Sequence, residues 1–292
     1  MSVPVSPIDM AFFDRLDDRI AAVDSVVSVG LDPDPARLPE AVRDADLPRW
    51  QFNRHVIDAT HEHAACYKPN AAFYEDADGW RALRETIAYA HGKDVPVLLD
   101  AKRADIGNTA RQYATILDDD HGPAADAITV NPFMGRDTLE PFLQRDSKGV
   151  FVLGRTSNPG GADLQDLELA SGEKLYERVV HLADLWNDNG NVGLVVGATN
   201  PDELESIREL VPDIPFLVPG VGAQGGDAEA AVEHGLADGV GLVNSSRGII
   251  FAGEDSEARG GEGDADADAY FGAAGEAAKR LKGRLNQYRQ NS

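Results

Sequence analysis

Residues 97–109 have the sequence VLLDAKRADIGNT. An apolar run at 97–99 passes into alternating charged residues and then into a segment with helical patterning. Uninterrupted apolar residues are typical of a strand that is buried on both faces, as in a parallel sheet covered by helices. The stretch therefore predicts one β-strand followed by one α-helix, with polar side chains at the junction between them.

The same unit recurs along the chain. Apolar runs predict eight strands in all, at 26–31, 64–68, 95–99, 126–130, 149–153, 192–196, 215–218 and 238–243. Helical patterns lie between them at 77–92, 106–119, 172–189, 201–210 and 227–235. Eight strands, each followed by a helix, are the arrangement of a single-domain (β/α)8 TIM barrel. An open doubly wound sheet is the alternative, but eight strands are many for it and no second domain is indicated.

The composition indicates an ordinary globular protein with an unusual charge. The 292 residues are 42% hydrophobic, and 27 Lys and Arg stand against 50 Asp and Glu, which gives a net charge of −23. A surface this acidic repels nucleic acid and anionic lipid. It favours adaptation to a salt-rich cytoplasm, because a Debye length of about 3 Å at molar salt screens like charges. An acidic protein without such adaptation is the simpler alternative.

Cysteine usage and hydropathy limit the remaining classes. Cys66 is the single cysteine, which excludes internal disulfides and a multi-cysteine zinc site. No run of about 18 apolar residues predicts a membrane span. The first ten residues lack the basic and apolar segments of a signal peptide. We therefore expect a cytoplasmic protein.

The end of the chain carries an acidic segment. Residues 252–269, AGEDSEARGGEGDADADA, lie between the last predicted strand and an amphipathic helix at 270–289. Such a composition is typical of a solvated, mobile loop. We expect an insertion in the single barrel domain that takes no part in the chemistry.

In a barrel of this kind the active site lies at the carboxyl ends of the strands. Because side chains alternate along a strand, Asp100 and Lys102 are expected to point the same way. Asp105 and Thr109 follow at the start of the next helix. Two carboxylates around a lysine keep it protonated, so it can deliver a proton to carbon. A structural salt bridge at the strand end is the alternative.

Two later strand ends predict a phosphate site. Residues 216–226, FLVPGVGAQGG, place glycines and Gln224 after a strand and before a helix, where backbone N–H groups favour an anion. Arg247 follows the next strand, and the last two loops of barrels often bind phosphate. The glycines also fit G-x-G-x-x-G, but no acid follows the next strand, which disfavours a dinucleotide site.

Polar residues end most of the other strands. Each of them taken alone is compatible with a turn or a cap, and together they predict one polar pocket; they are Asp32, Lys68, Thr129, Asn131 and residues 156–158. The seven histidines do not cluster, so no metal site is expected.

These motifs, in this order, resemble the longer-chain subfamily of orotidine 5′-phosphate decarboxylase. The resemblance rests on LLDAKRADIGNTA, RTSNPGG, VPGVGAQGG and NSSRGI, and it spans residues 25–250. It implies a (β/α)8 barrel that acts as a homodimer and converts orotidine 5′-phosphate to UMP and CO2, in the last step of UMP synthesis. It implies no metal or organic cofactor. Ala104 and Phe133 depart from the subfamily pattern, at positions without an assigned catalytic role.

The resemblance also implies roles for single residues. Lys102 is the general acid that protonates C6, Asp100 lies against the substrate carboxylate, and Asp105 is lent to the partner subunit's site. The remaining residues contact substrate: Asp32, Lys68 and Thr109 at the ribose, Ser157 at the pyrimidine, and Gln224, Arg247 and the loop of Pro219 at the phosphate.

Three other functions remain to be weighed. A magnesium-dependent keto-sugar-phosphate decarboxylase or synthase of the same superfamily has the D-x-K-x-x-D pattern, but it needs an acid where this chain has Lys68. A nicotinamide oxidoreductase is disfavoured by the acid missing after GVGAQG. A barrel that only binds nucleotides would not need the charged set of Asp100, Lys102 and Asp105.

Overall fold

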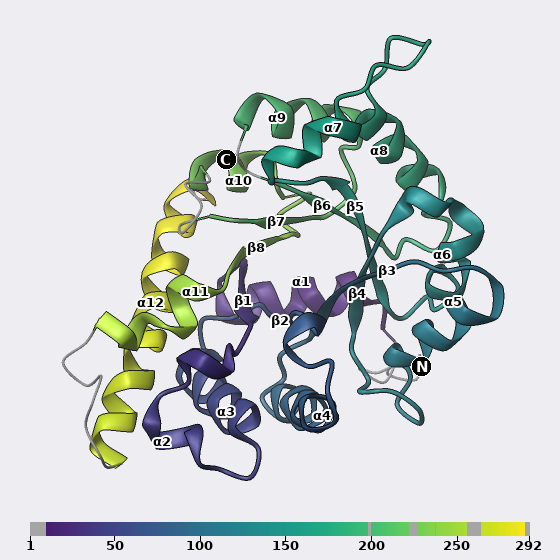
Figure 1. The fold of residues 1–292 in the computed structure, drawn as a ribbon. Helices are drawn as coiled ribbons and strands as arrows, with labels where there is room; N and C mark the ends of the chain where they lie inside the picture. Colours follow the sequence, from purple (N-terminus) through teal and green to yellow (C-terminus); the bar gives the residue numbers. More distant parts are fainter. Residues whose placement is uncertain (1–9, 198–199, 222–226, 237, 256–263, 290–292) are drawn as a thin grey trace, which may run out of the picture.

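The computed structural model describes residues 10–197, 200–221, 227–236, 238–255 and 264–289. Eight parallel strands form one sheet in the order β2-β1-β8-β7-β6-β5-β4-β3 (Figure 1). Their bounds are β1 Val27–Leu31, β2 Cys66–Pro69, β3 Leu98–Arg103, β4 Ala127–Val130, β5 Gly149–Arg155, β6 Val192–Val196, β7 Phe216–Pro219 and β8 Leu242–Ser245.

The ring closes between β2 and β3 without a regular ladder. Two isolated bridges, Tyr67 with Val97 and Asn70 with Asp100, join the two strands. The Tyr67 N–H also donates to the carbonyl of Pro96 at 3.0 Å. The first and last strands of the sheet therefore meet, which confirms the (β/α)8 barrel and rules out the open sheet.

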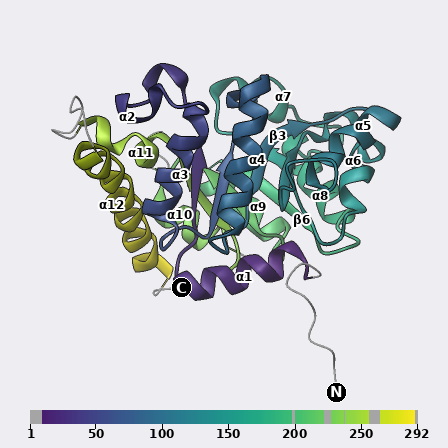
Figure 2. The same cartoon turned by 90° about the horizontal axis from the view of Figure 1, so that it is seen from below.

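Helices surround this ring on the outside (Figures 1 and 2). The longer ones are α3 Pro48–Thr60, α4 Ala77–His91, α5 Gly107–Ala114, α6 Arg136–Leu143, α8 Leu175–Leu185, α9 Pro201–Leu210, α10 Ala228–Glu233 and α12 Asp264–Arg289. Short α-helices are α2 Glu40–Arg43, α7 Ala162–Gln165 and α11 Arg247–Ile250. Single 3-10 turns are Pro35–Arg37, Ala71–Phe73, Thr115–Leu117, Pro132–Met134, Pro159–Gly161 and Ala252–Asp255.

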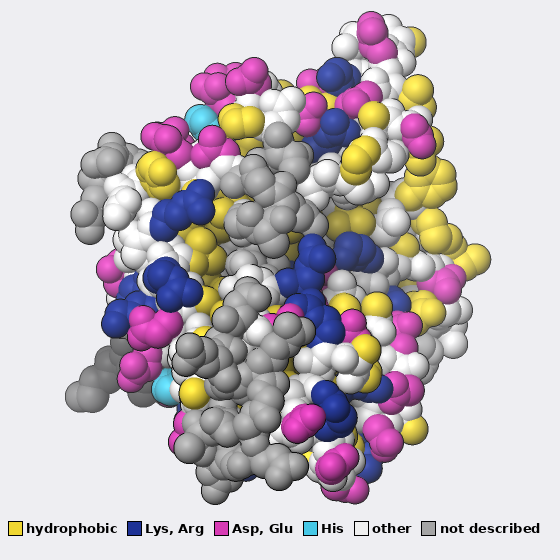
Figure 3. Space-filling model, turned by 60° about the vertical axis from the view of Figure 1, so that its left-hand side comes forward, with side chains coloured by type: hydrophobic (Ala, Val, Ile, Leu, Met, Phe, Trp, Pro, Cys, Tyr) yellow, Lys and Arg dark blue, Asp and Glu magenta, His cyan; other side chains and the backbone are white. Residues whose placement is uncertain are grey.

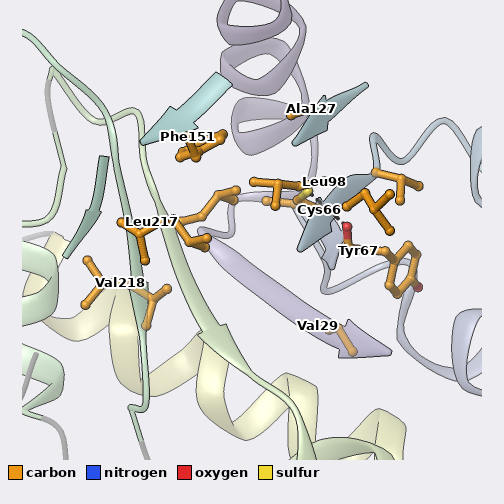
Figure 4. Packing of buried hydrophobic residues seen from close by; sticks show 14 of the residues in the cluster. Val29, Cys66, Tyr67, Leu98, Ala127, Phe151, Leu217 and Val218 are labelled. Carbon is orange, nitrogen blue, oxygen red and sulfur yellow. Dashed lines mark hydrogen bonds between the residues drawn. The ribbon is translucent and has the colours of Figure 1, made fainter. Parts of the chain in front are cut away.

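The core lies inside the ring and between the ring and the helices. Cys66, Leu98, Ala127, Phe151 and Leu217 come from different strands and pack together (Figure 4). Cys66 is fully buried, and burial raises the pKa of its thiol, so it behaves as a small apolar core residue.

Helix α1, Phe12–Val23, covers the amino end of the barrel (Figure 2). Its buried residues are Phe12, Leu16 and Ile20. Phe12 makes an edge-on contact with Phe151, with ring centroids 6.0 Å apart. A Cβ at Gly149 would lie 2.5 Å from the Phe12 ring, so this glycine permits the helix to seat directly on the strands.

Three predicted boundaries are corrected by the structure. Strand β3 continues to Arg103 instead of ending at 99, and β8 begins at Leu242 because Asp238 and Gly239 turn with φ of 48° and 85°. The final helix begins at Asp264, six residues before the predicted start. Alanines are strong helix formers and acids are favourable in a first helical turn, so this acidic stretch extends the helix. Most of the predicted loop, 256–263, lies outside the described residues.

A buried carboxylate ties elements together at the amino end. Asp126, just before β4, accepts hydrogen bonds from Arg15 of α1 at 2.7 Å, from His91 of α4 at 2.7 Å and from the Val97 N–H at 2.8 Å. Burial alone would raise its pKa, but His91, Arg15 and the Val97 N–H outweigh burial and hold the pKa well below its usual range. Asp126 therefore stabilises the fold in its ionised form.

We expect Asp126→Asn to lower the free energy of unfolding at pH 7 by about 3 kcal/mol, because it breaks a buried ion pair. The pKa of Asp126 is lower in the folded protein than in the unfolded chain, where it is about 4, so its ionised form adds stability above about pH 4. This stability is lost as the pH falls below about 4, and the difference in unfolding free energy between wild type and Asp126→Asn should therefore shrink. Urea unfolding at pH 7 and pH 3 measures both effects. Asp118→Asn is the control: that carboxylate pairs with Arg145 near the surface at 2.7 Å, and its loss should change stability by less than about 1 kcal/mol. Equal effects of the two variants would contradict the assignment.

Candidate active site

A cavity of about 360 Å³ opens at the carboxyl ends of the strands. The residues that line it come from the ends of seven strands, all but β4, and they include Asp32, Lys68, Asp100, Lys102, Thr156, Ser157, Asn158, Val195, Pro219, Gly220, Val221, Asn244, Ser246 and Arg247. In Figure 3, Lys and Arg side chains gather near the centre of one face, and Asp and Glu side chains lie mainly around its rim. A larger groove of about 920 Å³ lies between α5 and α6 and contains none of the residues that line the strand-end cavity.

Asp100 is the centre of the charged cluster in this cavity. One carboxylate oxygen accepts from Lys102 Nζ at 2.6 Å and from the Thr129 hydroxyl at 2.8 Å. The other accepts from Lys68 Nζ at 3.1 Å and from the Asn70 amide at 3.3 Å. A carboxylate on β3 thus holds two ammonium groups, one from β2 and one from its own strand.

The charges of this cluster depend on one another. Burial alone would raise the pKa of Asp100, but the ammonium groups of Lys68 and Lys102 lower it to about 2. Burial alone would lower the pKa of Lys68, but Asp100 and Asp32 raise it above its usual value. At neutral pH Asp100 is therefore an ionised carboxylate and Lys68 a protonated lysine, each stabilised by the charge of the other.

Lys102 reaches Asp100 by an irregularity in β3. Its φ is +49°, and the pairing of β3 with β4 shifts register between Leu99 and Arg103. The Lys102 N–H donates to the Thr129 hydroxyl at 2.9 Å, which holds the backbone in this conformation. A left-handed conformation costs a residue with a Cβ about 1–2 kcal/mol. The ammonium is therefore aimed by a strained bulge and not by simple strand alternation.

Asp32 follows β1 and lines the cavity, where its charge helps to raise the pKa of Lys68. Its Oδ1 is buried and has no hydrogen-bond partner among the described residues. An unpaired buried carboxylate oxygen is costly unless a ligand supplies a donor. Asp32 therefore has the position and an unused acceptor oxygen to bind a ligand hydroxyl.

The cavity also has a tight glycine turn and an arginine at the ends of β7 and β8. Gly220 has a φ of 91° directly after β7, and Arg247 begins α11 after β8. Gly30 permits Ser246 to pack against β1, since a Cβ there would lie 1.8 Å from the Ser246 hydroxyl. Gln224, predicted to bind at this end, lies outside the described residues.

The loop after β5 forms a further wall of the cavity. A Cβ at Gly197 would lie 2.9 Å from Cβ of Ser157, so Ser157 packs directly on the backbone at the end of β6. The Gln165 amide binds the Thr156 N–H at 3.0 Å and its hydroxyl at 2.8 Å. These contacts fix the loop that presents Ser157 to the cavity.

Four residues predicted at the site do not line the cavity. Asn131 instead caps the turn Pro132–Met134 and accepts from the Phe133 N–H at 3.0 Å. Thr129 is buried and directs its hydroxyl to Asp100. Asp105 accepts a hydrogen bond from the Ile106 N–H at 2.8 Å, and Thr109 is exposed on α5. The neighbouring Ile106 is 60% exposed.

Two polar residues of the site were not singled out from the sequence. Asn70 binds Asp100, and the buried Asn244 lines the cavity and accepts from the Ser28 hydroxyl at 3.1 Å. Asn70 lies two residues after Lys68, so the same alternation that paired Asp100 with Lys102 was the available signal.

The described residues contain no group of three or more His, Cys, Asp or Glu side chains arranged to hold a metal ion. Within the same residues, no helix combines the length and apolar character needed to cross a bilayer.

Comparisons with known proteins agree with this geometry. The family model for orotidine 5′-phosphate decarboxylase / HUMPS family matches residues 25–260. The orotidine 5′-phosphate decarboxylase of Haloarcula marismortui is 85% identical over 280 residues, which are 96% of this chain and 100% of that protein. That of Halorubrum lacusprofundi is 76% identical over 286 residues, with coverage of 96% and 100%. Both come from halophilic archaea, which supports the salt-adapted origin expected from the charge.

Among solved structures, the OMP decarboxylase of Leishmania donovani superposes with a TM-score of 0.78 at 41% identity, covering 96% of this chain and 99% of that one. Since the family model and these relatives extend over most of the sequence, this chain belongs to the orotidine 5′-phosphate decarboxylase / HUMPS family.

Proposed function

We propose that this protein is a carboxy-lyase that converts orotidine 5′-phosphate to UMP and CO2, the last step of pyrimidine nucleotide synthesis, in the cytoplasm. The observation that carries the proposal is the ammonium of Lys102, 2.6 Å from the largely buried carboxylate of Asp100, in a cavity that Arg247 also lines. A proton donor to carbon, a carboxylate and a distant phosphate site are what this reaction needs.

The proposed chemistry is a replacement of CO2 by a proton at C6. The bond between C6 and the carboxylate breaks and leaves its electron pair on C6, and CO2 departs. A proton moves from Lys102 Nζ to C6, and Lys102 regains a proton from solvent. In this scheme Asp100 lies against the substrate carboxylate. It repels that group and holds Lys102 in place for the transition state.

The other side chains hold the substrate in this scheme. Asp32 and Lys68 bind ribose hydroxyls, and the unpaired Oδ1 of Asp32 supports that role. Ser157 contacts the pyrimidine, and Thr129 acts by orienting Asp100. At the phosphate, the residues are Gln224, Arg247 and the loop that begins at Pro219. Binding energy from the phosphate then supports catalysis at C6, a distant atom.

We also propose a homodimer in which each subunit lends Asp105 and Thr109 to the partner subunit's site. Two observations support this. Neither side chain lines the cavity of its own subunit. Large apolar side chains are exposed at Ile106, which follows Asp105 in the chain, with 60%, and at Phe133, which follows β4, with 80%, as expected of a surface that a second copy covers.

Magnesium-dependent chemistry on a keto-sugar phosphate is the second candidate, because it shares the D-x-K-x-x-D pattern. It needs an acid at the end of β2, where this chain has Lys68, 3.1 Å from Asp100. An ammonium at that place repels a divalent cation. The site geometry therefore favours the metal-free reaction.

Lys102→Ala should abolish turnover, lowering kcat by at least about 10³-fold, because it removes the proton donor. The measurement is the ultraviolet absorbance of orotidine 5′-phosphate in molar KCl with a chelator present. Lys93→Ala is the control, since Lys93, just after α4, pairs with Asp58 of α3 at 3.0 Å, outside the site, and should leave turnover unchanged. Turnover that the chelator removes would favour the magnesium-dependent reaction instead.

Mixing the inactive variants Asp105→Ala and Lys102→Ala should restore activity. After subunit exchange, half of the dimers are mixed and each holds one intact site, so about a quarter of wild-type activity is expected. Native mass spectrometry verifies the exchange. Complete exchange without recovered activity would rule out shared sites.

A further inference from the structure

Among the described residues, the helical shell behind the site contains a buried polar network that the mechanism above does not use. Asn53 of α3 donates from one amide nitrogen to the Tyr74 hydroxyl at 2.8 Å and to the Thr86 hydroxyl of α4 at 3.0 Å. The Tyr74 hydroxyl donates in turn to the carbonyl of Leu31 at 2.8 Å. Asn53, Tyr74 and Thr86 are all fully buried.

The network ends at the backbone that carries Asp32. Leu31 is the last residue of β1, and Asp32 follows it directly. Because the Tyr74 oxygen already accepts from Asn53, its proton is directed to the Leu31 carbonyl. Burial strongly raises the pKa of Tyr74, and the charge of Asp32 adds to the effect, so the phenol remains a donor at neutral pH.

Tyr74 itself is held firmly. Its N–H donates to the Ala71 carbonyl at 2.8 Å, and its own carbonyl accepts from the Asp76 N–H at 2.8 Å. Gly79 of α4 packs against the same carbonyl, where a Cβ would lie 2.5 Å from the oxygen. The hydroxyl is therefore presented to β1 from a rigid support.

Local stability alone does not account for the arrangement. The Asn53 Oδ1 is buried without a hydrogen-bond partner among the described residues, a cost that an apolar side chain at this position would avoid. A buried polar group that is only partly satisfied calls for another explanation. The network supplies a hydrogen bond to the Leu31 carbonyl, which belongs to the peptide bond that joins Leu31 to Asp32. Asp32 is the residue whose Oδ1 is unpaired.

We infer that Tyr74 is a positioning residue for Asp32. Through the Leu31 carbonyl it sets the direction in which the Asp32 carboxylate meets a ribose hydroxyl, and so it controls the preference for the ribonucleotide over its deoxy analogues. This inference rests on the proposed role of Asp32 as a ribose ligand.

The test compares Tyr74→Phe with Tyr67→Phe. Both tyrosines are fully buried and lose only a hydroxyl, but that of Tyr67 contacts Thr60 at 2.9 Å and the Ile57 carbonyl at 3.2 Å, within α3. Calorimetry gives the dissociation constants of UMP, 2′-deoxy-UMP and 3′-deoxy-UMP for each protein. The same titrations with Asp32→Asn identify the ribose hydroxyl that Asp32 contacts. It is the hydroxyl whose absence from the nucleotide weakens binding to wild type but not to Asp32→Asn.

The preference is the ratio of the dissociation constants of UMP and of the analogue that lacks the ribose hydroxyl contacted by Asp32. Tyr74→Phe should reduce this preference by about tenfold, equal to 1.4 kcal/mol, and Tyr67→Phe should leave it within about twofold. Asn53→Ala, which retains the tyrosine but frees its hydroxyl, should give an intermediate loss. A Tyr74→Phe protein with the full wild-type preference would overturn the inference, as would equal losses in the two phenylalanine variants. A wild-type protein that binds all three nucleotides equally would instead refute the ribose role of Asp32.

Discussion

The structure depends on one buried carboxylate shared by two ammonium groups. Asp100 accepts from Lys68 and Lys102, and the three charges are stable in the barrel mouth only together. The cluster also crosses the seam between β2 and β3, where isolated bridges replace a regular ladder. Lys68 and Asn70 reach Asp100 from the β2 side of this seam. The charges that carry the proposed chemistry thus also close the ring at its least regular point.

The negative net charge of the chain explains why the cavity needs its own cations. A chain of charge −23 repels an anionic substrate at long range, so recognition must come from a local concentration of cations. The cavity provides it with Lys68, Lys102 and Arg247. At the salt concentrations implied by its halophilic relatives, distant repulsion is screened within a few ångströms, but contacts inside the cavity persist. The acidic surface and the basic pocket can therefore coexist in one protein.

Much of this architecture could be predicted from the sequence, and the exceptions have physical causes. The eight strands were evident because both faces of most of them are buried, so their apolar runs are continuous. In β3 only the first two residues are buried, and its charged second half was not predicted as strand. The start of β8 was placed too early because apolar residues at 240–243 continue from a turn whose positive φ values hydropathy does not reveal. Strand alternation predicted that Asp100 and Lys102 lie together, but it could not reveal the left-handed Lys102 that directs the ammonium to Asp100. That conformation depends on Thr129, a residue of the neighbouring strand. The network around Tyr74 was missed because it depends on contacts between elements distant in sequence.

The two ends of the barrel divide stability and chemistry between them. At the amino end, Asp126 is fully paired with Arg15, His91 and a backbone N–H, and α1 closes the ring with apolar side chains. At the carboxyl end, Lys102 is strained and Asp32 has an unpaired oxygen. The strained Lys102 and the unpaired Asp32 oxygen each lower the stability of the fold and leave a group ready for a ligand. The paired Asp126 and the apolar packing of α1 offset that loss, which is how a marginally stable fold can maintain an active site with polar groups that only a substrate would satisfy.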